Sequence, residues 1–371
     1  MAKLGEVCKV SPSTKNIERQ GAWLLNLDMV EQQTGRVIEY KYVGEDDLNG
    51  SIIQFDTENV LYSKLRPNLN KVVLPQKDGF STSELLPLRP DARVLNRDYL
   101  AVFLRSDSFV TWAVSKTAGA KMPRLGTKDL MSAEIPVPTI EQQKKIAEKF
   151  KKLEQLISLR NQQLAKLDEL VKARFVEMFL LHDYPTKTLD ELSIGKGEYG
   201  AQSASTEYNP SRPRYVRITD VNDDGTLNDN CVSSENISDD AQYKLSYGDF
   251  MFARMGATVG KTYAFLSGNQ IFAGYLIRYK LNLSLVNPRY LFWYTKLDEY
   301  QTWVKLNQSG AAQPGINAKK YGSLKIPVPP IELQNQFATF VARIDQQKQT
   351  VQQSLEKLEL MKKALMQEYF G

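Results

Sequence analysis

The chain has 371 residues, of which 42% are hydrophobic and 25% are charged, and this composition is ordinary for a globular protein with two or more hydrophobic cores. Its formal net charge of +5 is too small to indicate a nucleic-acid partner unless the placement of the charges is known. The sequence excludes a zinc site and a membrane span, because its one histidine and two cysteines do not cluster and no run of 18 apolar residues occurs, and it predicts a cytoplasmic protein with reduced thiols.

Residues 1 to about 140 are predicted to form one globular domain that mixes strands and helices. Short runs rich in β-branched and aromatic residues, such as 60–62 and 71–74, are separated by turns that contain glycine or asparagine. An amphipathic helix is expected over 97–115. The domain ends at the Ile-Pro-Val-Pro segment 135–138, because proline fixes φ and disfavours a helical conformation at the residue before it. We therefore expect an α+β domain.

A long helix is expected to follow, over 141–183, because apolar residues recur there at alternating steps of four and three. This heptad spacing is typical of a helix that pairs with another helix along a narrow seam. A helix of about 40 residues extends about 60 Å at 1.5 Å per residue. The positions that define the seam are Ile146, Phe150, Leu153, Ile157, Arg160, Leu164, Leu167, Val171, Arg174 and Met178.

The second half of the chain repeats the first. Residues 290–370 align with 99–179 without a gap, at a shift of 191 positions, and one third of the aligned residues are identical. A period of this length excludes solenoids and propellers, whose units span roughly 20 to 50 residues. A second helix in the globular part is expected over 288–305. The predicted organisation is a first domain (1–140), a helical spacer (141–183), a second domain (184–331) and a second long helix (332–371).

Duplicated domains usually lie about a pseudo-two-fold axis, and that symmetry makes the two long helices antiparallel. The second helix keeps the heptad frame, but Lys348 and Lys362 fall where the first helix is apolar, and Arg160 and Arg174 fall where the second is apolar. Such differences could fix the register of two helices of one chain, or the long basic side chains could simply extend along the rim of the seam. The predicted fold class is α+β, with two tandem domains joined by two long antiparallel coiled-coil helices.

Three motifs that resemble reactive or cofactor-binding sites have simpler explanations. The segment 195–200 fits the GxGxxG pattern of dinucleotide sites, but a loop composition follows it where that site needs a helix. Residues 287–290 approach an amino-methyltransferase motif but fit the capped start of a helix. Asp28 with Glu39 and Lys41 has the residue types of a nuclease site, at a spacing that arises readily by chance. The sequence therefore predicts a chain that is not itself an enzyme and holds no cofactor.

Basic and amide side chains concentrate on short loops that occupy matching places in the two copies. Residues 64–71 correspond to 254–261, and residues 119–124 correspond to 310–315. Arginine and lysine can bind guanine or phosphates, and asparagine and glutamine can bind adenine. Because the loops keep their place but change their residues, we expect them to read different DNA sequences from a shared scaffold. The predicted DNA contacts are Lys64, Arg66, Asn68, Lys71, Lys121, Arg124, Lys128, Arg217, Arg254, Thr258, Lys261, Gln313 and Lys319.

These features together resemble a known family. The motif Ile-Pro-Val-Pro-x-Ile-Glu-x-Gln, followed by a long helix, occurs at 135–143 and at 326–334, and the segments 61–67 and 248–261 add to the match. The order of these motifs, the duplication and the placement of the helices make the whole chain similar to the specificity (S) subunits of type I restriction-modification systems. The resemblance implies two target recognition domains, each of which reads half of a split DNA sequence, with the paired helices as a molecular ruler.

The resemblance also implies the partners. The ligand is double-stranded DNA, two methyltransferase (M) subunits bind the S subunit, and the M subunits carry S-adenosylmethionine and the adenine-N6 chemistry. It leaves open whether endonuclease/translocase (R) subunits join the assembly or the system only modifies DNA. The geometry gives an independent argument. Two domains held apart by rods of about 60 Å can contact one face of B-DNA only at sites separated by about one helical turn, about 34 Å, or a multiple of it. This predicts a bipartite target. The alternatives are a stand-alone DNA-modifying enzyme and a protein scaffold that does not read DNA.

Overall fold

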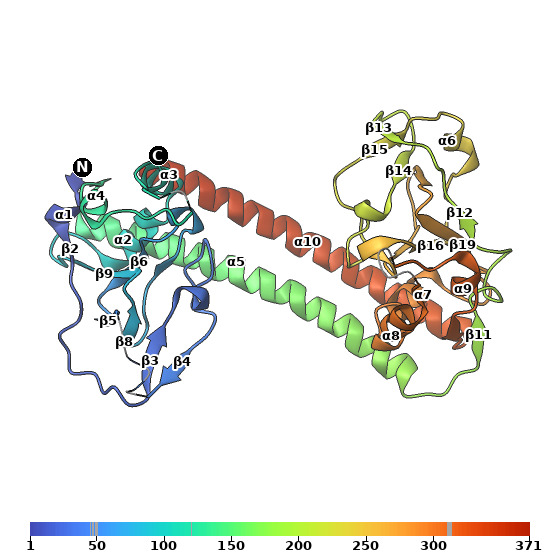
Figure 1. The fold of residues 1–371 in the computed structure, drawn as a ribbon, viewed down its shortest axis with the longest axis horizontal. Coiled ribbons are helices and arrows are strands. Elements are labelled where there is room, and N and C mark those ends of the chain that lie inside the picture. The colour runs from blue at the N-terminus through green and yellow to red at the C-terminus, as the bar shows by residue number, and fades with distance from the viewer. Residues whose placement is uncertain (45, 47, 49–50, 120, 310–313) are drawn as a thin grey trace. The chain divides into compact units, whose positions relative to one another are not determined.

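The computed structural model describes all residues of the chain except 45, 47, 49–50, 120 and 310–313. By its internal contacts the chain divides into two compact units. Unit 1 contains Met1–Gln162 and Gln352–Gly371, and unit 2 contains Gln163–Val351. Each unit holds one globular domain and a part of both long helices (Figure 1). The predicted domain boundaries separate the globular parts from the long helices, whereas these units each contain both. Those boundaries therefore stay a prediction.

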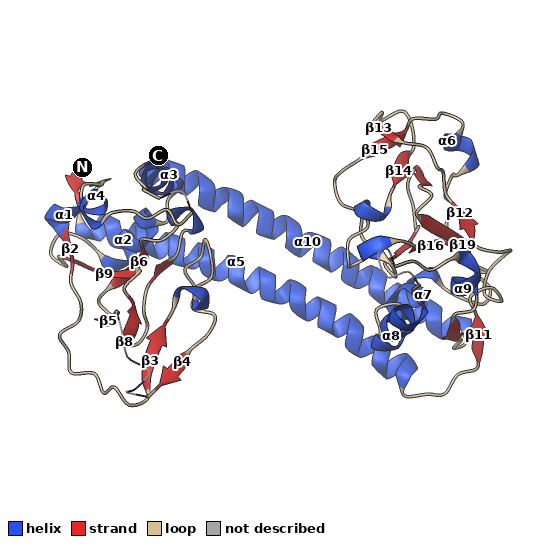
Figure 2. Ribbon diagram, in the orientation of Figure 1, coloured by secondary structure: helices blue, strands red, loops and turns tan. Residues whose placement is uncertain are grey.

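The globular domain of unit 1 is built on two four-stranded sheets (Figure 2). The first sheet contains β2 (Cys8–Val10), β6 (Val60–Ser63), β7 (Val72–Val73) and β9 (Leu85–Pro90), and the second contains β3 (Ala22–Leu25), β4 (Lys41–Val43), β5 (Ile52–Phe55) and β8 (Gly79–Thr82). The first sheet is antiparallel with the order β2-β9-β6-β7, and the second has the order β4-β3-β8-β5, in which β3 and β8 are parallel. A short pair, β1 (Ala2–Lys3) with β10 (Glu134–Ile135), joins the two ends of the domain.

The helices of this domain are α1 (Leu4–Val7), α2 (Arg97–Leu104), α3 (Asp107–Ser115) and α4 (Thr127–Met131). The prediction of one helix over 97–115 is wrong, because the segment breaks into α2 and α3 at Arg105 and Ser106. Ser106 has an extended backbone, and its hydroxyl accepts a hydrogen bond from Phe109 N (3.3 Å). A serine in this position caps the start of a new helix. The apolar periodicity continues across the break and therefore does not reveal it.

Unit 2 repeats the first sheet of unit 1 and only part of the second. The repeated sheet contains β12 (Glu198–Tyr199), β16 (Asp249–Ala253), β17 (Thr262–Ala264) and β19 (Leu276–Lys280), in the equivalent order β12-β19-β16-β17. The parallel pair β14 (Arg214–Val216) and β18 (Gln270–Phe272) corresponds to β3 and β8. The remaining elements are β11 (Thr186–Thr188) paired with β20 (Lys325–Pro327), β13 (Ser205–Glu207) paired with β15 (Val232–Ser234), and α6 (Asp239–Gln242).

The helices that follow in unit 2 are α7 (Pro288–Tyr294), α8 (Asp298–Asn307) and α9 (Ala318–Gly322). The prediction of one helix over 288–305 is therefore also wrong. Thr295 Oγ1 hydrogen-bonds to Phe292 O (2.7 Å) and to Thr262 Oγ1 in the core (2.7 Å), and Leu297 is extended. The local bond to Phe292 and the tertiary bond to Thr262 fix the end of α7, and the helix stops where the sequence pattern would continue it.

The two long helices form as the heptad spacing predicts. α5 spans Ile140–Phe175 and continues as a π-helical turn, η4, over Val176–Leu180, and α10 spans Ile331–Phe370. The predicted seam positions are buried or half-buried, and Phe150 has no exposed surface. None of the helices in the described part of the chain has both the length and the apolar character that a membrane crossing requires.

Within unit 1, the segments of α5 and α10 pair antiparallel. Lys149 Nζ donates a hydrogen bond to Tyr369 OH (2.8 Å), and Lys362 Nζ donates one to Glu154 Oε1 (3.0 Å). The ring of Phe370 packs against Phe150 (centroids 6.4 Å apart). Residues later in α5 therefore contact residues earlier in α10, as in an antiparallel pair.

Within unit 2, the pairing has the same direction. Lys348 forms an ion pair with Asp168, and the rings of Phe175 and Phe337 lie edge to face with centroids 5.3 Å apart. The antiparallel prediction is confirmed in each unit. Lys348, like Lys362 in unit 1, bonds a carboxylate of the other helix, and this favours the interpretation that the seam lysines fix the register.

Each long helix is attached to its globular domain by one buried glutamine. In unit 1, Gln143 Nε2 donates to Val94 O (2.9 Å) and Pro138 O (2.8 Å), and Oε1 accepts from Asn96 N (2.8 Å). In unit 2, Gln334 makes the same three bonds, with Leu285 O (3.1 Å), Pro329 O (2.8 Å) and Asn287 N (2.8 Å). Both glutamines are the last residue of the repeated Ile-Pro-Val-Pro-x-Ile-Glu-x-Gln motif, so the motif fixes where the helix leaves the domain.

Replacing Gln334 with alanine should lower the free energy of unfolding of unit 2 by about 2–4 kcal/mol, because it leaves buried backbone groups without their partner. Gln334 itself is fully buried. Urea unfolding followed by hydrogen exchange in β20 and α7 measures the loss. Gln347, an exposed glutamine on the same helix, provides the matched control, since its replacement with alanine should change stability by less than about 0.5 kcal/mol. Equal effects of the two substitutions would contradict the attachment.

Candidate nucleic-acid interface

In unit 1, the two basic loops identified in the sequence lie side by side. Leu125 N donates to Lys64 O (2.9 Å), and Arg66 N donates to Pro123 O (2.8 Å). The guanidinium of Arg66 also reaches Lys121 O (3.5 Å). The loop that follows β6 and the loop that precedes α4 are thus held together by their backbones, and they bring three predicted cations to one surface.

Unit 2 repeats this backbone geometry with different side chains. Arg254 O accepts a hydrogen bond from Ile316 N (3.0 Å), which is the position that Lys64 holds in unit 1. Pro314 O likewise accepts from Gly256 N (2.9 Å). Since the hydrogen bonds match one for one, the two copies present equivalent loops on one scaffold.

The loop after β6 contains two residues in the left-handed conformation. In unit 2 both positions are glycine, Gly256 (φ 69°) and Gly260 (φ 87°). In unit 1 they are Arg66 (φ 49°) and Asn70 (φ 51°). An arginine in this conformation costs about 1–2 kcal/mol relative to glycine. Arg66 therefore occupies a strained backbone conformation at an exposed position of this loop.

The predicted contacts of unit 1 fall into two groups. Arg124 is exposed but forms an ion pair with Glu84 (3.2 Å), and Lys71 donates to Leu27 O (2.6 Å). Burial lowers the pKa of Lys71, although Asp28 opposes this effect. Lys71 is therefore engaged in the fold. The second group is half-buried or exposed and forms no ion pair with any described residue; it contains Lys64, Arg66, Asn68, Lys121 and, on α4, Lys128.

In unit 2, two of the predicted cations are already paired with acids. The guanidinium of Arg217 makes two hydrogen bonds (2.8 and 3.1 Å) to the carboxylate of Asp220, which is fully buried. Lys261, which holds the position of Lys71, forms an ion pair with Asp223 (2.7 Å). These two residues remain predicted DNA contacts, but the bonds that they make hold the fold of the domain.

The other predicted residues of unit 2 are more open. Thr258 is half-buried and its hydroxyl donates to Met255 O (3.1 Å), which closes the turn before β17. Lys319 is exposed on α9. Gln313 lies outside the described residues.

Sequence reasoning missed two tyrosines beside Arg254. The guanidinium lies 5.0 Å from the ring centroid of Tyr199 and 5.5 Å from that of Tyr275. Tyr199 belongs to β12 and Tyr275 precedes β19, and both are exposed. No local pattern links positions so far apart in sequence, so only the fold reveals this cluster.

Two of the motifs set aside in the sequence have structural explanations. The glycine run 195–200 contains strand β12, and no helix begins directly after it, so it lacks the geometry of a dinucleotide site. Asn287 caps α7, since its side chain accepts from Arg289 N (2.9 Å). Among the described residues, no three His, Cys, Asp or Glu side chains gather as a metal site.

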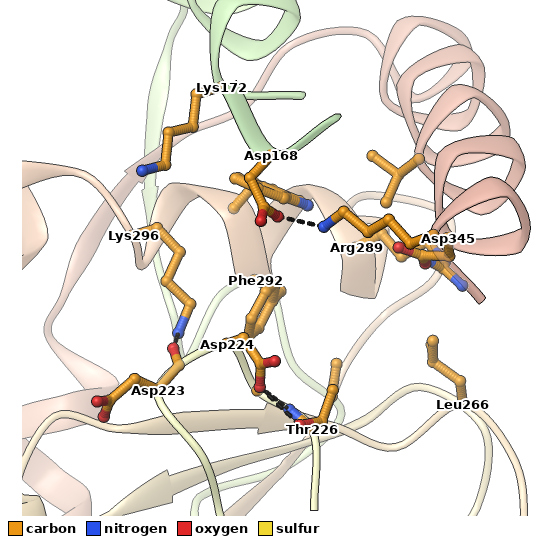
Figure 3. Close-up of a pocket in the computed structure, with 15 residues that line it drawn as sticks. Asp168, Lys172, Asp223, Asp224, Thr226, Leu266, Arg289, Phe292, Lys296 and Asp345 are labelled. Carbon is orange, nitrogen blue, oxygen red and sulfur yellow. Dashed lines mark hydrogen bonds and ion pairs between the residues drawn. The ribbon is translucent and has the colours of Figure 1, made fainter. Parts of the chain in front are cut away.

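Unit 2 also contains a cavity of about 720 Å³ lined by α5, α7, α10 and the turn at 223–226 (Figure 3). Lys296 Nζ donates to Asp223 O there (2.6 Å), and burial lowers the pKa of Lys296 while Asp224 and Asp223 oppose this effect. Two further ion pairs in the cavity wall join residues of different helices: Asp168 with Lys348, and Asp345 with Arg289. The described residues that line it include no histidine or cysteine. Since the charges are largely neutralised in pairs, the paired loops are the better candidate interface.

Comparison with known proteins gives one family for both halves of the chain. Residues 1–169 and residues 182–360 each match the family model described as type I restriction modification DNA specificity domain. Together these matches cover nearly the whole chain.

Individual relatives are distant. The chain is 25% identical over 157 residues to the type I restriction enzyme EcoDI specificity subunit of Escherichia coli, which covers 40% of this chain and 34% of that protein. It is 26% identical over 126 residues to the type I restriction enzyme MjaVIII specificity subunit of Methanocaldococcus jannaschii, covering 34% and 29%. The aligned part thus spans about a third of the length of these two relatives.

A solved structure shares the fold. The S subunit of a type I restriction-modification system from M. genitalium aligns over 100% of this chain and 95% of its own, with a TM-score of 0.64 and 15% sequence identity. At this identity the likeness concerns the fold alone.

Proposed function

This chain belongs to the family of type I restriction modification DNA specificity domains, and on that premise we propose that it is the non-catalytic subunit that reads a bipartite, interrupted DNA target. In this proposal it directs two methyltransferase subunits to that target in the cytoplasm. The partners, not this chain, bind S-adenosylmethionine and methylate adenine at N6. Endonuclease subunits are a further partner if the system also restricts DNA.

The observation that carries the proposal is the repeated loop scaffold with changed side chains. The same backbone hydrogen bonds hold Lys64 in unit 1 and Arg254 in unit 2, and the same left-handed position holds Arg66 in unit 1 and Gly256 in unit 2. A shared backbone keeps each loop in the same relation to its domain. The changed side chains then give each domain its own base preference, because base edges differ in their donors and acceptors. A scaffold without DNA readout has no need for such a change.

Two kinds of contact to DNA have different roles in the proposal: phosphate contacts position the protein, and base contacts read the sequence. Exposed lysines such as Lys121, Lys128 and Lys319 suit phosphate oxygens, which position a protein on the duplex without reading its sequence. Residues fixed by the backbone of the paired loops suit base edges, since a base contact needs a defined place. Methyl transfer is assigned to the partners because both halves of this chain match a DNA specificity domain.

The experiment that tests the proposal removes one heptad from each long helix, residues 157–163 and residues 352–358. Removing whole heptads keeps the seam residues in phase. After co-expression with the methyltransferase genes beside it, the N6-methyladenine motif in host DNA should keep both half-sites and change the number of unread base pairs between them. A heptad removed from only one helix should abolish methylation, because the two helices no longer match. A contiguous wild-type motif, or half-sites that change with helix length, contradicts the proposal.

A further inference from the structure

Arg254 is held in place through its backbone, its side chain and two aromatic rings. Its backbone N donates to Tyr275 O (3.0 Å), its O accepts from Ile316 N (3.0 Å), and its side-chain Nε donates to Gly274 O (2.9 Å). The guanidinium also lies over the rings of Tyr199 and Tyr275. Backbone, side chain and ring contacts together leave this arginine little conformational freedom to lose on binding.

The outer end of the same side chain is free. Neither Nη1 nor Nη2 of Arg254 forms a hydrogen bond or ion pair with any residue that the structure describes. The flanking rings are open to solvent, with Tyr275 54% and Tyr199 42% exposed. Nη1 and Nη2 form a fork of N–H donors in a fixed plane, which matches two acceptors about as far apart as those of a carboxylate, a phosphate or guanine.

We infer that Arg254 reads a guanine in the half-site bound by unit 2, with Tyr199 and Tyr275 as its positioning residues. This inference rests on the proposed function. In the major groove, guanine presents N7 and O6 side by side as acceptors, and a bidentate arginine is the commonest contact to them. A phosphate can accept from the same fork, but a phosphate contact needs no fixed position relative to the base sequence, whereas a contact to N7 and O6 does. The rigid placement of the guanidinium therefore favours a base over the backbone.

The equivalent position of unit 1 has a different chemistry. Lys64 N donates to Glu84 O (3.0 Å), just as Arg254 N donates to Tyr275 O, so Glu84 stands where unit 2 has Tyr275. Glu84 pairs with Arg124 instead of stacking on a cation. Lysine can also contact guanine N7 and O6, but its ammonium is a point charge on a flexible stem and lacks the planar fork of arginine. The inference is thus specific to unit 2, and unit 1 serves as its internal comparison.

The test uses the full chain co-expressed with its methyltransferase partner, and it maps N6-methyladenine motifs for single variants. Lys64→Ala first identifies the half-site of unit 1. Arg254→Lys keeps the charge but removes the fork, and should reduce the preference for guanine over adenine at one position of the other half-site by about tenfold or more. Tyr275→Leu should relax the same position to a smaller degree. Arg343→Lys and Tyr247→Leu, which change exposed residues of unit 2 away from the loops, should leave the motif unchanged.

The outcomes separate the inference from the proposed function. A uniform loss of methylation at every target, with no change of motif, would mean that Arg254 binds a phosphate and would overturn the inference. So would an unchanged motif in Arg254→Lys, or a wild-type half-site of unit 2 without guanine. In each of these cases a bipartite wild-type motif leaves the proposed function intact. A contiguous motif, or none, overturns the proposed function itself.

Discussion

Replacing Arg278 with methionine is expected to lower the free energy of unfolding of unit 2 by about 3–5 kcal/mol at pH 7. The side chain of Arg278 is only 7% exposed and forms ion pairs with Glu198 and Asp249, whose own side chain is 5% exposed. It also donates to Lys244 O (2.9 Å). Methionine fills much of the volume but leaves Asp249 as a buried carboxylate without a cation. Urea unfolding, followed by hydrogen exchange in β16 and β19, measures the loss.

The loss of unfolding free energy caused by Arg278→Met should become smaller as the pH falls. Burial raises the pKa of Asp249, and the Ser246 N–H and the Arg278 charge only partly oppose this effect. Burial also raises the pKa of Glu198, but hydrogen bonds from Arg278 and Lys280 outweigh burial and bring it below its ordinary value. Without Arg278, both pKa values rise in the folded state. The folded variant then binds protons more readily than the folded wild type, so acid stabilises it relative to the wild type.

The matched control adds Asp249→Asn to Arg278→Met. The amide still accepts the hydrogen bond from Ser246 N (2.9 Å) but carries no charge, so the double variant should recover part of the stability at pH 7 and show a weaker pH dependence. A deficit that grows as the pH falls, or a double variant less stable than the single one, would show that Arg278 does not act by neutralising Asp249.

The sequence predicts the long helices well because their signal is local. A seam of fixed spacing needs only the right residue every three or four positions, and burial of Phe150, Val171 and Val341 follows that spacing in the structure. The two breaks in the shorter helices were not predicted, since they depend on Ser106 and Thr295. Serine capping and a threonine bond to a distant strand leave the apolar periodicity unchanged.

The correspondence of the two basic loops was predicted from the sequence, but the bonds of their side chains were not. Loop order alone put Lys64 and Arg254 at matching positions, and the backbone hydrogen bonds confirm that correspondence. Composition could not show that the guanidinium of Arg217 is bound to Asp220, or that Tyr199 approaches Arg254. Arg217 and Asp220 are only three positions apart, but periodicity does not show how their side chains pair. Tyr199 and Arg254 lie far apart in sequence, so their contact depends on strand order, which periodicity does not determine.

Aromatic packing gives the other large expected effect. Phe337 of α10 is fully buried in unit 2, with its ring centroid 5.3 Å from Phe175, 5.4 Å from Phe179 and 6.5 Å from Trp293. Since Phe175 and Phe179 belong to α5 and its π-helical end, this cluster binds both long helices to the globular domain. Replacing Phe337 with alanine removes the central ring and should cost about 3–5 kcal/mol of stability in unit 2.

The repeat supplies the control for this prediction within the same molecule. Ile146 is the residue of unit 1 that aligns with Phe337, and the substitution leaves it intact. Hydrogen exchange in α2 of unit 1 should therefore stay unchanged, while α7 of unit 2 loses protection. Phe340→Ala, at a half-buried position one turn away, should cost less than half as much. If the loops read DNA and the helices only hold them, Phe337→Ala lowers the extent of methylation but keeps the motif. A changed motif would instead place sequence readout in the helix seam, because Phe337 belongs to α10 and not to either basic loop.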